Sequence, residues 1–246
     1  MLTISHFSKT YPGGKKAVDD LSLTVHPGEI CGFIGHNGAG KTTTLRAVAG
    51  IMNYDVGTIT IAGHDVKKDP VLAKKVTAFL PDNPDLYEFL SGIKFLTFIA
   101  DIYQIPKEKR QPLIQKYADA FELTDALGSP INSYSHGMKQ KLALISAFIR
   151  EPSLLILDEP FVGLDPKASF TMKQFLRELC DAGGAVFFST HVLEVAEKLC
   201  DTIAIIKHGQ LIEIGKTSEI VGNSSLESVF LELEEEGTAP AGGPHK

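Results

Sequence analysis

The chain has 246 residues, 43% of them hydrophobic and 22% charged, with a formal net charge of -6. This composition is typical of a globular protein, and the negative balance excludes a general attraction to nucleic acid. The three cysteines, Cys31, Cys180 and Cys200, are scattered in apolar stretches, which predicts buried free thiols, and no apolar run is long enough to span a membrane.

The N-terminal residues favour short strands joined by tight turns. Residues 2–8 and 18–25 have strand-like patterns, and a Pro-Gly dipeptide follows each of them. A further strand at residues 58–61 is bounded by glycines on both sides. These segments predict an antiparallel β subdomain beside an α/β core.

Residues 35–43 carry a phosphate-binding pattern: a glycine, four residues, then Gly-Lys-Thr. A short apolar strand at residues 30–34 precedes the pattern and a helix at residues 43–49 follows it, which is the required context. Glycines let successive N–H groups point at phosphate oxygens, and the helix N-terminus adds its own donors. We expect Lys41 to reach the β- and γ-phosphates and the Thr42 hydroxyl to bind Mg²⁺. The predicted loop residues are Gly35, His36, Asn37, Gly38, Ala39, Gly40, Lys41, Thr42 and Thr43.

A helical segment interrupts the α/β pattern after an apolar strand at residues 76–80. That strand ends in a polar loop, and from residue 91 to residue 127 apolar side chains recur at helical spacing. Pro106 separates at least two helices, and a helix from about residue 138 to residue 150 returns the chain to the core. We therefore expect an inserted helical subdomain over about residues 86–150.

Strands and helices alternate after the insert. The expected strands are 153–157, 185–190, 202–207 and 210–214, and the expected helices are 167–181, 193–199 and 226–236. This alternation predicts an α/β fold with a parallel sheet and helices on both faces. We expect one domain over residues 1–236, and the Gly/Pro-rich residues 237–246 are expected to be disordered.

Two further sites carry residues suited to nucleotide chemistry. Asp158 and Glu159 end an apolar strand, where Asp158 can hold Mg²⁺ through its water shell and Glu159 can orient or deprotonate a water. Ser135 precedes a helix and suits two roles: a simple N-cap, or a second phosphate-binding helix start together with the Gly137 N–H.

These motifs, with Gly163-Leu164-Asp165 and a lone His191, resemble in order and spacing the nucleotide-binding subunit of ATP-binding-cassette (ABC) transporters. The resemblance covers residues 2–230 and implies a P-loop NTPase core that binds ATP and Mg²⁺. It implies that Tyr11 stacks on adenine, that Asp165 lies in a loop crossing to a partner subunit, and that His191 touches the γ-phosphate. By the same resemblance, Lys41, Glu159 and His191 are the catalytic residues.

The chain departs from the family pattern at two places. Asp82, followed by Asn83, stands where the family usually has a glutamine, so either residue could take that role; with Asp82, the metal ligands would be Thr42, Asp82 and Asp158. The signature Ser135–Met138 has His136 and Met138 where glycine and glutamine are usual. The sequences of both segments resemble those of bacterial exporter-type cassettes.

The resemblance implies an ATPase subunit that energises transport, in the export direction, through a separate membrane permease. Two such cassettes would pair head to tail, and the protein would lie in the cytoplasm on the inner face of the cell membrane, with no nucleic-acid partner. The aromatic segment at residues 82–103 would contact the permease. One alternative is a non-transport ABC ATPase, which generally carries two cassettes or long coiled-coil insertions. The other is a P-loop small-molecule kinase, which would not need Ser135, Gly137 or His191.

Overall fold

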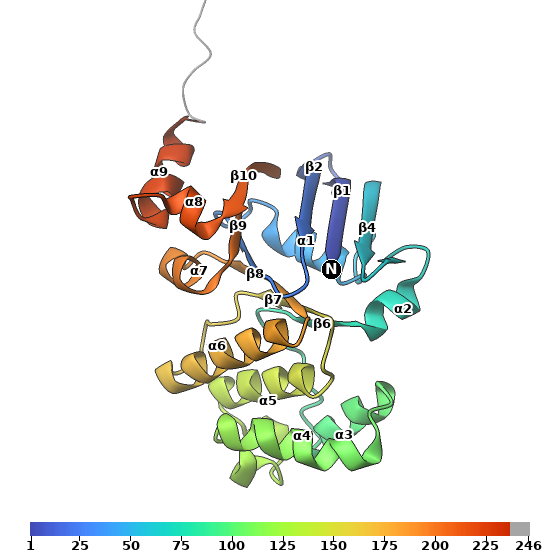
Figure 1. The fold of residues 1–246 in the computed structure, drawn as a ribbon. Coiled ribbons are helices and arrows are strands. Elements are labelled where there is room, and N and C mark those ends of the chain that lie inside the picture. The colour runs from blue at the N-terminus through green and yellow to red at the C-terminus, as the bar shows by residue number, and fades with distance from the viewer. Residues whose placement is uncertain (237–246) are drawn as a thin grey trace, which may run out of the picture.

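A computed structural model describes residues 1–236, and the expectation of a disordered tail at residues 237–246 lies outside the described residues. Its first sheet is antiparallel, with the strand order β2-β1-β4-β5. Figure 1 shows β2, β1 and β4 side by side. The strands are β1 (Leu2–Thr10), β2 (Lys16–Val25), β4 (Val56–Ile61) and β5 (His64–Asp65). The predicted antiparallel subdomain is confirmed, and its first three strands are longer than their apolar patterns indicated.

The second sheet has six strands in the order β10-β9-β3-β8-β7-β6. They are β3 (Ile30–Ile34), β6 (Thr77–Leu80), β7 (Leu154–Asp158), β8 (Ala185–Thr190), β9 (Thr202–Lys207) and β10 (Gln210–Lys216). All neighbouring pairs are parallel except β9 and β10. Because parallel strands end at the same edge, the segments that follow β3, β6, β7 and β8 are brought together there.

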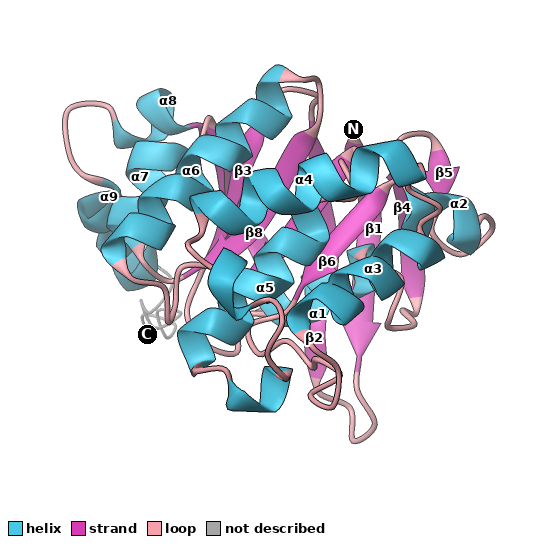
Figure 2. Ribbon diagram, turned by 90° about the horizontal axis from the view of Figure 1, so that it is seen from below, coloured by secondary structure: helices cyan, strands magenta, loops and turns pink. Residues whose placement is uncertain are grey.

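Helices cover both faces of this sheet, but each face packs against a different set of elements. On one face, side chains such as Leu155 and Phe188 pack with the larger helices of the chain; on the other, Ile156 and Phe187 pack with the antiparallel sheet, α1 and α2. Figure 2 shows α4, α5 and α6 in front of the strands. The helices are α1 (Lys41–Val48), α2 (Pro70–Lys75), α3 (Gly92–Ile102), α4 (Lys107–Ala120), α5 (His136–Phe148), α6 (Pro166–Asp181), α7 (Leu193–Leu199), α8 (Thr217–Val221) and α9 (Leu226–Glu236).

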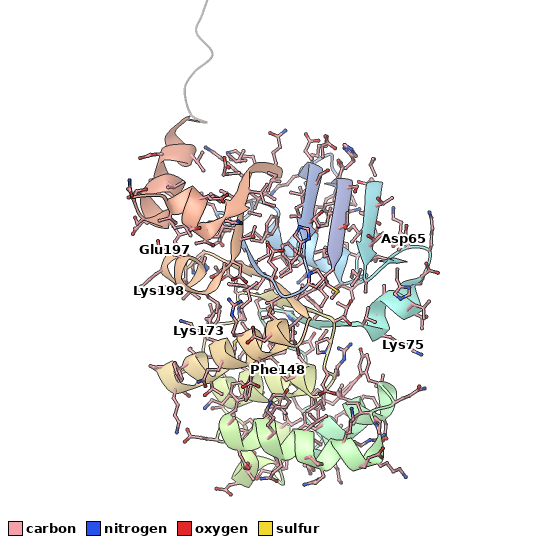
Figure 3. The ribbon with its side chains drawn as sticks, in the orientation of Figure 1. Asp65, Lys75, Phe148, Lys173, Glu197 and Lys198 are labelled. Atoms are coloured by element: carbon pink, nitrogen blue, oxygen red, sulfur yellow. The ribbon has the colours of Figure 1, made fainter. Side chains whose placement is uncertain are left out.

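The predicted helical subdomain is formed by α3, α4 and α5, with short 3₁₀ turns at Thr124–Ala126 and Ile131–Ser133. Its core joins α6 through aromatic rings: Phe148 stacks on Tyr117 at 5.4 Å between centroids and meets Phe175 at 5.5 Å (Phe148 is labelled in Figure 3). Aromatic pairs of this kind stabilise the folded state by more than the burial of their apolar area alone. The three cysteines are buried and free, as expected.

Candidate functional site

The backbone of the phosphate loop packs closely against β9 and β2, and two of its positions have room only for glycine. A Cβ on Gly35 would lie 2.3 Å from the carbonyl oxygen of Ile206 at the end of β9. Gly40, which caps α1 with a φ of 113°, would bring a Cβ to 2.6 Å from the Ala17 carbonyl oxygen. The loop backbone is therefore fixed between β9 and β2, with its turn closed onto the first residues of α1.

Lys41 is a buried cation at the base of this loop, with a relative exposure of 6%. Its Nζ donates to the carbonyl oxygens of Gly35 at 2.5 Å and His36 at 3.3 Å, and lies 3.8 Å from Glu159 Oε1. Burial lowers the pKa of Lys41, while the carboxylates of Glu159 and Asp158 oppose that shift. The site thus places one positive charge between the loop carbonyls and two carboxylates.

Asp158 offers a buried carboxylate oxygen at the end of β7. Its exposure is 2%, and its Oδ1 accepts a hydrogen bond from the Ser189 hydroxyl on β8. Its Oδ2 is buried without a hydrogen-bond partner among the described residues. A buried, unpaired carboxylate oxygen is costly and is the kind of ligand that Mg²⁺ prefers, so this residue fits a metal site.

Glu159 and His191 form a pair beside that carboxylate. The Nδ1 of His191 lies 3.0 Å from Glu159 Oε2, and the His191 backbone N–H donates to the same oxygen at 3.3 Å. Glu159 has a φ of 48°, a left-handed backbone that costs about 1–2 kcal/mol for a residue with a Cβ. Its N–H donates to the Ser189 carbonyl oxygen at 3.1 Å, which holds this backbone against β8. Strain of this kind often accompanies functional sites.

A cavity of about 280 Å³ gathers most of the predicted site residues at this edge of the sheet. It is lined by Tyr11, Lys15, Ala17, His36, Asn37, Gly38, Gly40, Lys41, Thr42, Thr43, Asp82, Asp158 and Glu159. Tyr11 is half-exposed, and its hydroxyl lies 3.2 Å from Thr43 Oγ1. A larger hollow of about 740 Å³ lies at the opposite ends of β3 and β9, and no predicted site residue lines it.

The loop after β6 separates the two candidates for the usual glutamine position. Asp82 lines the cavity of the phosphate loop, whereas Asn83 lines a second hollow with Glu88, His136 and Lys139. Within residues 1–236 no group of three or more His, Cys, Asp or Glu side chains is placed to hold a metal ion. A Mg²⁺ ion at Asp158 and Asp82 would therefore need phosphate oxygens and water to complete its coordination.

The structure places Ser135, Gly137 and Asp165 outside this cavity. Ser135 caps α5, accepting a hydrogen bond from the Met138 N–H at 3.3 Å, so its capping role is real. Asp165 caps α6 and lies 2.8 Å from Lys141 Nζ, and this hydrogen bond lowers the pKa of Asp165. Lys141 belongs to α5, so the start of α6 is tied to α5, and the predicted residues on these two helices form a second group outside the cavity.

Sequence reasoning missed two kinds of site residue. Ser189 holds both Asp158 and the Glu159 backbone, yet it looks like an ordinary polar end of β8. The signal that the sequence does offer is its place in the Ser189-Thr190-His191 run that ends a strand. Lys15 and Ala17 line the cavity from the turn before and the start of β2, and no local pattern marks them.

Comparison with known proteins decides the family. A family model described as "ABC transporter" matches residues 18–162. The chain belongs to the ABC transporter family. This confirms the resemblance drawn from the motifs.

Relatives and a solved structure agree with this assignment. The chain is 40% identical to the uncharacterized ABC transporter ATP-binding protein YhcH of Bacillus subtilis, over 82% of this chain and 65% of that protein. It is 35% identical to the ABC-type transporter ATP-binding protein EcsA of Bacillus subtilis, over 88% of this chain and 90% of that protein. A solved ATP-binding subunit of an ABC transporter superposes with a TM-score of 0.91 at 32% identity, over 95% of this chain and 99% of that chain.

The match to some relatives is partial in length. The chain spans 65%, 61% and 62% of three curated ABC ATP-binding relatives. The fold and family therefore follow from the comparisons, whereas the activity and partners of the whole protein are proposals.

Proposed function

We propose that the chain is the ATP-binding and ATP-hydrolysing subunit of an ABC transporter, which energises export through a separate membrane permease. One observation carries the proposal: a single cavity is lined by the phosphate loop, by Asp158 with its unpaired oxygen and by Glu159, whose carboxylate is contacted by His191 from outside the cavity lining. A phosphate-binding cation, a metal ligand and a candidate base are the parts that phosphoryl transfer to water requires.

ATP would occupy the cavity with its phosphates in the loop and its adenine on Tyr11. The loop N–H groups and Lys41 would bind the β- and γ-phosphates, and Lys41 would stabilise the charge that develops on them during hydrolysis. Thr42, Asp82 and Asp158 would hold Mg²⁺, which supplies charge neutralisation at the phosphate oxygens. Asp82 is favoured over Asn83 because its side chain lines this cavity.

Glu159 is the candidate general base. Its two carboxylate oxygens face different neighbours, with Oε1 toward Lys41 and Oε2 toward His191. In the proposed reaction Glu159 accepts a proton from the attacking water, and His191 keeps the carboxylate oriented and contacts the γ-phosphate. The hydrogen bond from the His191 N–H and the contact from its Nδ1 hold the Glu159 carboxylate before the substrate arrives.

The second group of residues would serve a partner cassette. Ser135 and Gly137 lie at the start of α5, and Asp165 lies at the start of α6, outside the chain's own cavity. In a head-to-tail pair, these residues would face the phosphate loop of the second subunit and close its ATP site. The partner would be a second copy or a related cassette.

An aromatic surface on the helical subdomain would bind the permease. Tyr87, Phe89 and Phe98 are 49%, 80% and 39% exposed, and Tyr87 lies 6.1 Å from Phe89 and 5.5 Å from Phe98 between ring centroids. Such a surface suits a short helix laid into a groove. No helix of residues 1–236 is long and apolar enough to cross a membrane. In the proposed assembly the subunit lies on the cytoplasmic face of the membrane, attached to the permease by this aromatic surface.

The test is ATP hydrolysis by the purified chain with and without Mg²⁺. We expect Mg²⁺-dependent phosphate release that is lost in Lys41→Ala, because that change removes the cation facing the phosphates. A small-molecule kinase would instead transfer phosphate to an acceptor and tolerate Ser135→Ala. A non-transport ABC ATPase would hydrolyse ATP but would not co-purify with a membrane protein from the native cell.

A further inference from the structure

The C-terminal helix α9 reaches the phosphate loop. The ring of Phe230 lies 5.0 Å from the ring of His36 between centroids, with an interplanar angle of 67°. His36 is the second residue of the loop and lines its cavity. Phe230 itself is 6% exposed, so the ring that meets the loop is anchored in the core.

Two contacts, one on each side of Phe230 along the chain, hold helix α9 against the rest of the molecule. The Leu226 N–H donates to Glu197 Oε2 on α7 at 2.8 Å, and Leu226 is fully buried (Figure 3 labels Glu197). Farther along α9, the Leu233 carbonyl oxygen accepts from Lys207 Nζ at 3.2 Å. Lys207 follows Ile206, the residue whose carbonyl oxygen lies behind Gly35. The end of β9 thus contacts both the loop and the helix.

The position of His36 is linked to Lys41. The His36 carbonyl oxygen accepts hydrogen bonds from the Ala39 N–H at 3.1 Å and from Lys41 Nζ at 3.3 Å. A shift of His36 would therefore move the turn of the loop and one acceptor of the lysine together. The Phe230 ring limits that shift because it packs against the His36 side chain.

We propose that Phe230 is a positioning residue for the phosphate loop, so that α9 sets the affinity of the cassette for nucleotide. The inference rests on the proposed nucleotide binding. A loop that is held in its binding geometry loses less freedom when phosphate binds, and the apparent affinity falls with the fraction of molecules in the competent geometry. Phe230 acts on this fraction and does not touch the reacting atoms.

Phe230→Ala should therefore weaken binding of Mg·ATP by about 2- to 10-fold, the range expected for an aromatic pair contact. The hydrolysis rate at saturating ATP should stay unchanged, because Glu159 and His191 are oriented by their contacts with each other and not by Phe230. The signature is a raised KM with an unaltered kcat. Loss of fold alone would lower the amount of active protein and reduce kcat instead.

The experiment measures binding of a fluorescent ATP analogue to the full chain with Mg²⁺, alongside thermal unfolding and steady-state hydrolysis. Leu231→Ala is the matched control, because Leu231 is 57% exposed on the same helix. Phe230→Leu keeps most of the buried apolar volume while removing the ring, and should weaken binding in the same direction. It carries the test if Phe230→Ala does not fold.

A double-mutant cycle with His36→Ala separates the ring contact from a general loosening of the helix. We expect Phe230→Ala to add little to the loss of affinity in the His36→Ala background. An equal added loss in both backgrounds, or unchanged affinity in Phe230→Ala and Phe230→Leu, would overturn the proposal. If the wild-type chain itself fails to bind the analogue, the proposed function fails instead.

Discussion

Glu159 shows how much of the candidate chemistry is decided by single residues. It combines a left-handed backbone with contacts to Lys41 and His191, and its side chain is only 17% exposed. A replacement at this position therefore tests the proposed base while the surrounding contacts can be kept. Glutamine is suitable because it has the same length and can still accept hydrogen bonds.

We expect Glu159→Gln to bind Mg·ATP and lose most of its turnover, by about 100-fold or more, because the amide cannot take the proton of the attacking water. ATP that is bound and not hydrolysed should then hold two subunits together. Single-turnover hydrolysis and light scattering with saturating Mg·ATP measure both effects. Wild-type turnover in this variant would remove Glu159 from the role of base, and a monomer under these conditions would contradict the closed pair.

For single site residues, the sequence predicts where each residue lies better than it predicts which residues it contacts. Asp158, Glu159 and His191 could be placed at the sheet edge because each follows an apolar strand. Two hydrogen bonds could not be predicted: the one that the Ser189 hydroxyl donates to Asp158, and the one that the Glu159 N–H donates to the Ser189 carbonyl oxygen. Both depend on the register that sets Asp158 opposite Ser189 in β7 and β8. Register between strands distant in sequence is fixed by tertiary packing.

Among the elements, length decides what the sequence predicts. The bounds of β8, α7 and α9 match their apolar patterns, whereas α2, α8 and β5, with 6, 5 and 2 residues, were not predicted. These elements are too short to show the repeat of apolar side chains by which a helix or a strand is recognised. The antiparallel sheet that shares a face with α1 was predicted as a subdomain, but its packing on the parallel sheet is a long-range contact that no local pattern encodes.

The helix cap at the start of α6 should contribute measurably to the stability of the fold. Asp165 accepts from the Ala168 N–H at 2.8 Å, so Asp165→Ala should cost about 1 kcal/mol of unfolding free energy at pH 7 by loss of the cap. Asp165→Asn should keep most of this energy, since asparagine also caps helices. Chemical unfolding of the three proteins measures the difference.

The pH dependence of this cap follows from its pKa. The hydrogen bond from Lys141 holds the pKa of Asp165 below its usual value, so the charged form is favoured in the folded state. The stabilisation is present above the unfolded pKa of about 4 and is lost as pH falls through the lower folded pKa. The wild-type advantage over Asp165→Asn should shrink over that acidic window. An advantage that grows as pH falls would contradict the assigned contact.

For the whole molecule, the division of site residues into two groups predicts a paired enzyme. Lys41 lies in the cavity and Ser135 lies outside it, so each ATP site should need both groups from different chains. Specific ATPase activity should therefore rise with protein concentration until the pair is saturated. Mixing inactive Lys41→Ala with inactive Ser135→Ala should restore part of the activity, because mixed pairs contain one intact site. Activity that does not depend on concentration, with no recovery on mixing, would indicate a monomeric enzyme.

The aromatic surface of the helical subdomain is the proposed contact with the membrane partner. Phe89 is 80% exposed and Tyr87 is 49% exposed, although each is large and apolar enough to favour burial. Both follow Asp82, which lines the nucleotide cavity, so a change at the phosphates could move this surface through one short loop. The partner contact and the nucleotide site would then be coupled within a single segment.

Phe89→Asp should leave the ATPase of the isolated subunit and its unfolding temperature close to wild type, because an exposed side chain supports little of the core. Membrane association and transport in the native cell should fall, since a carboxylate cannot enter an apolar groove. Tyr87→Asp should act in the same direction, and Ile212→Asp, on the exposed side of β10, is the control that should change neither. Normal docking and transport in Phe89→Asp would place the permease contact elsewhere on the molecule.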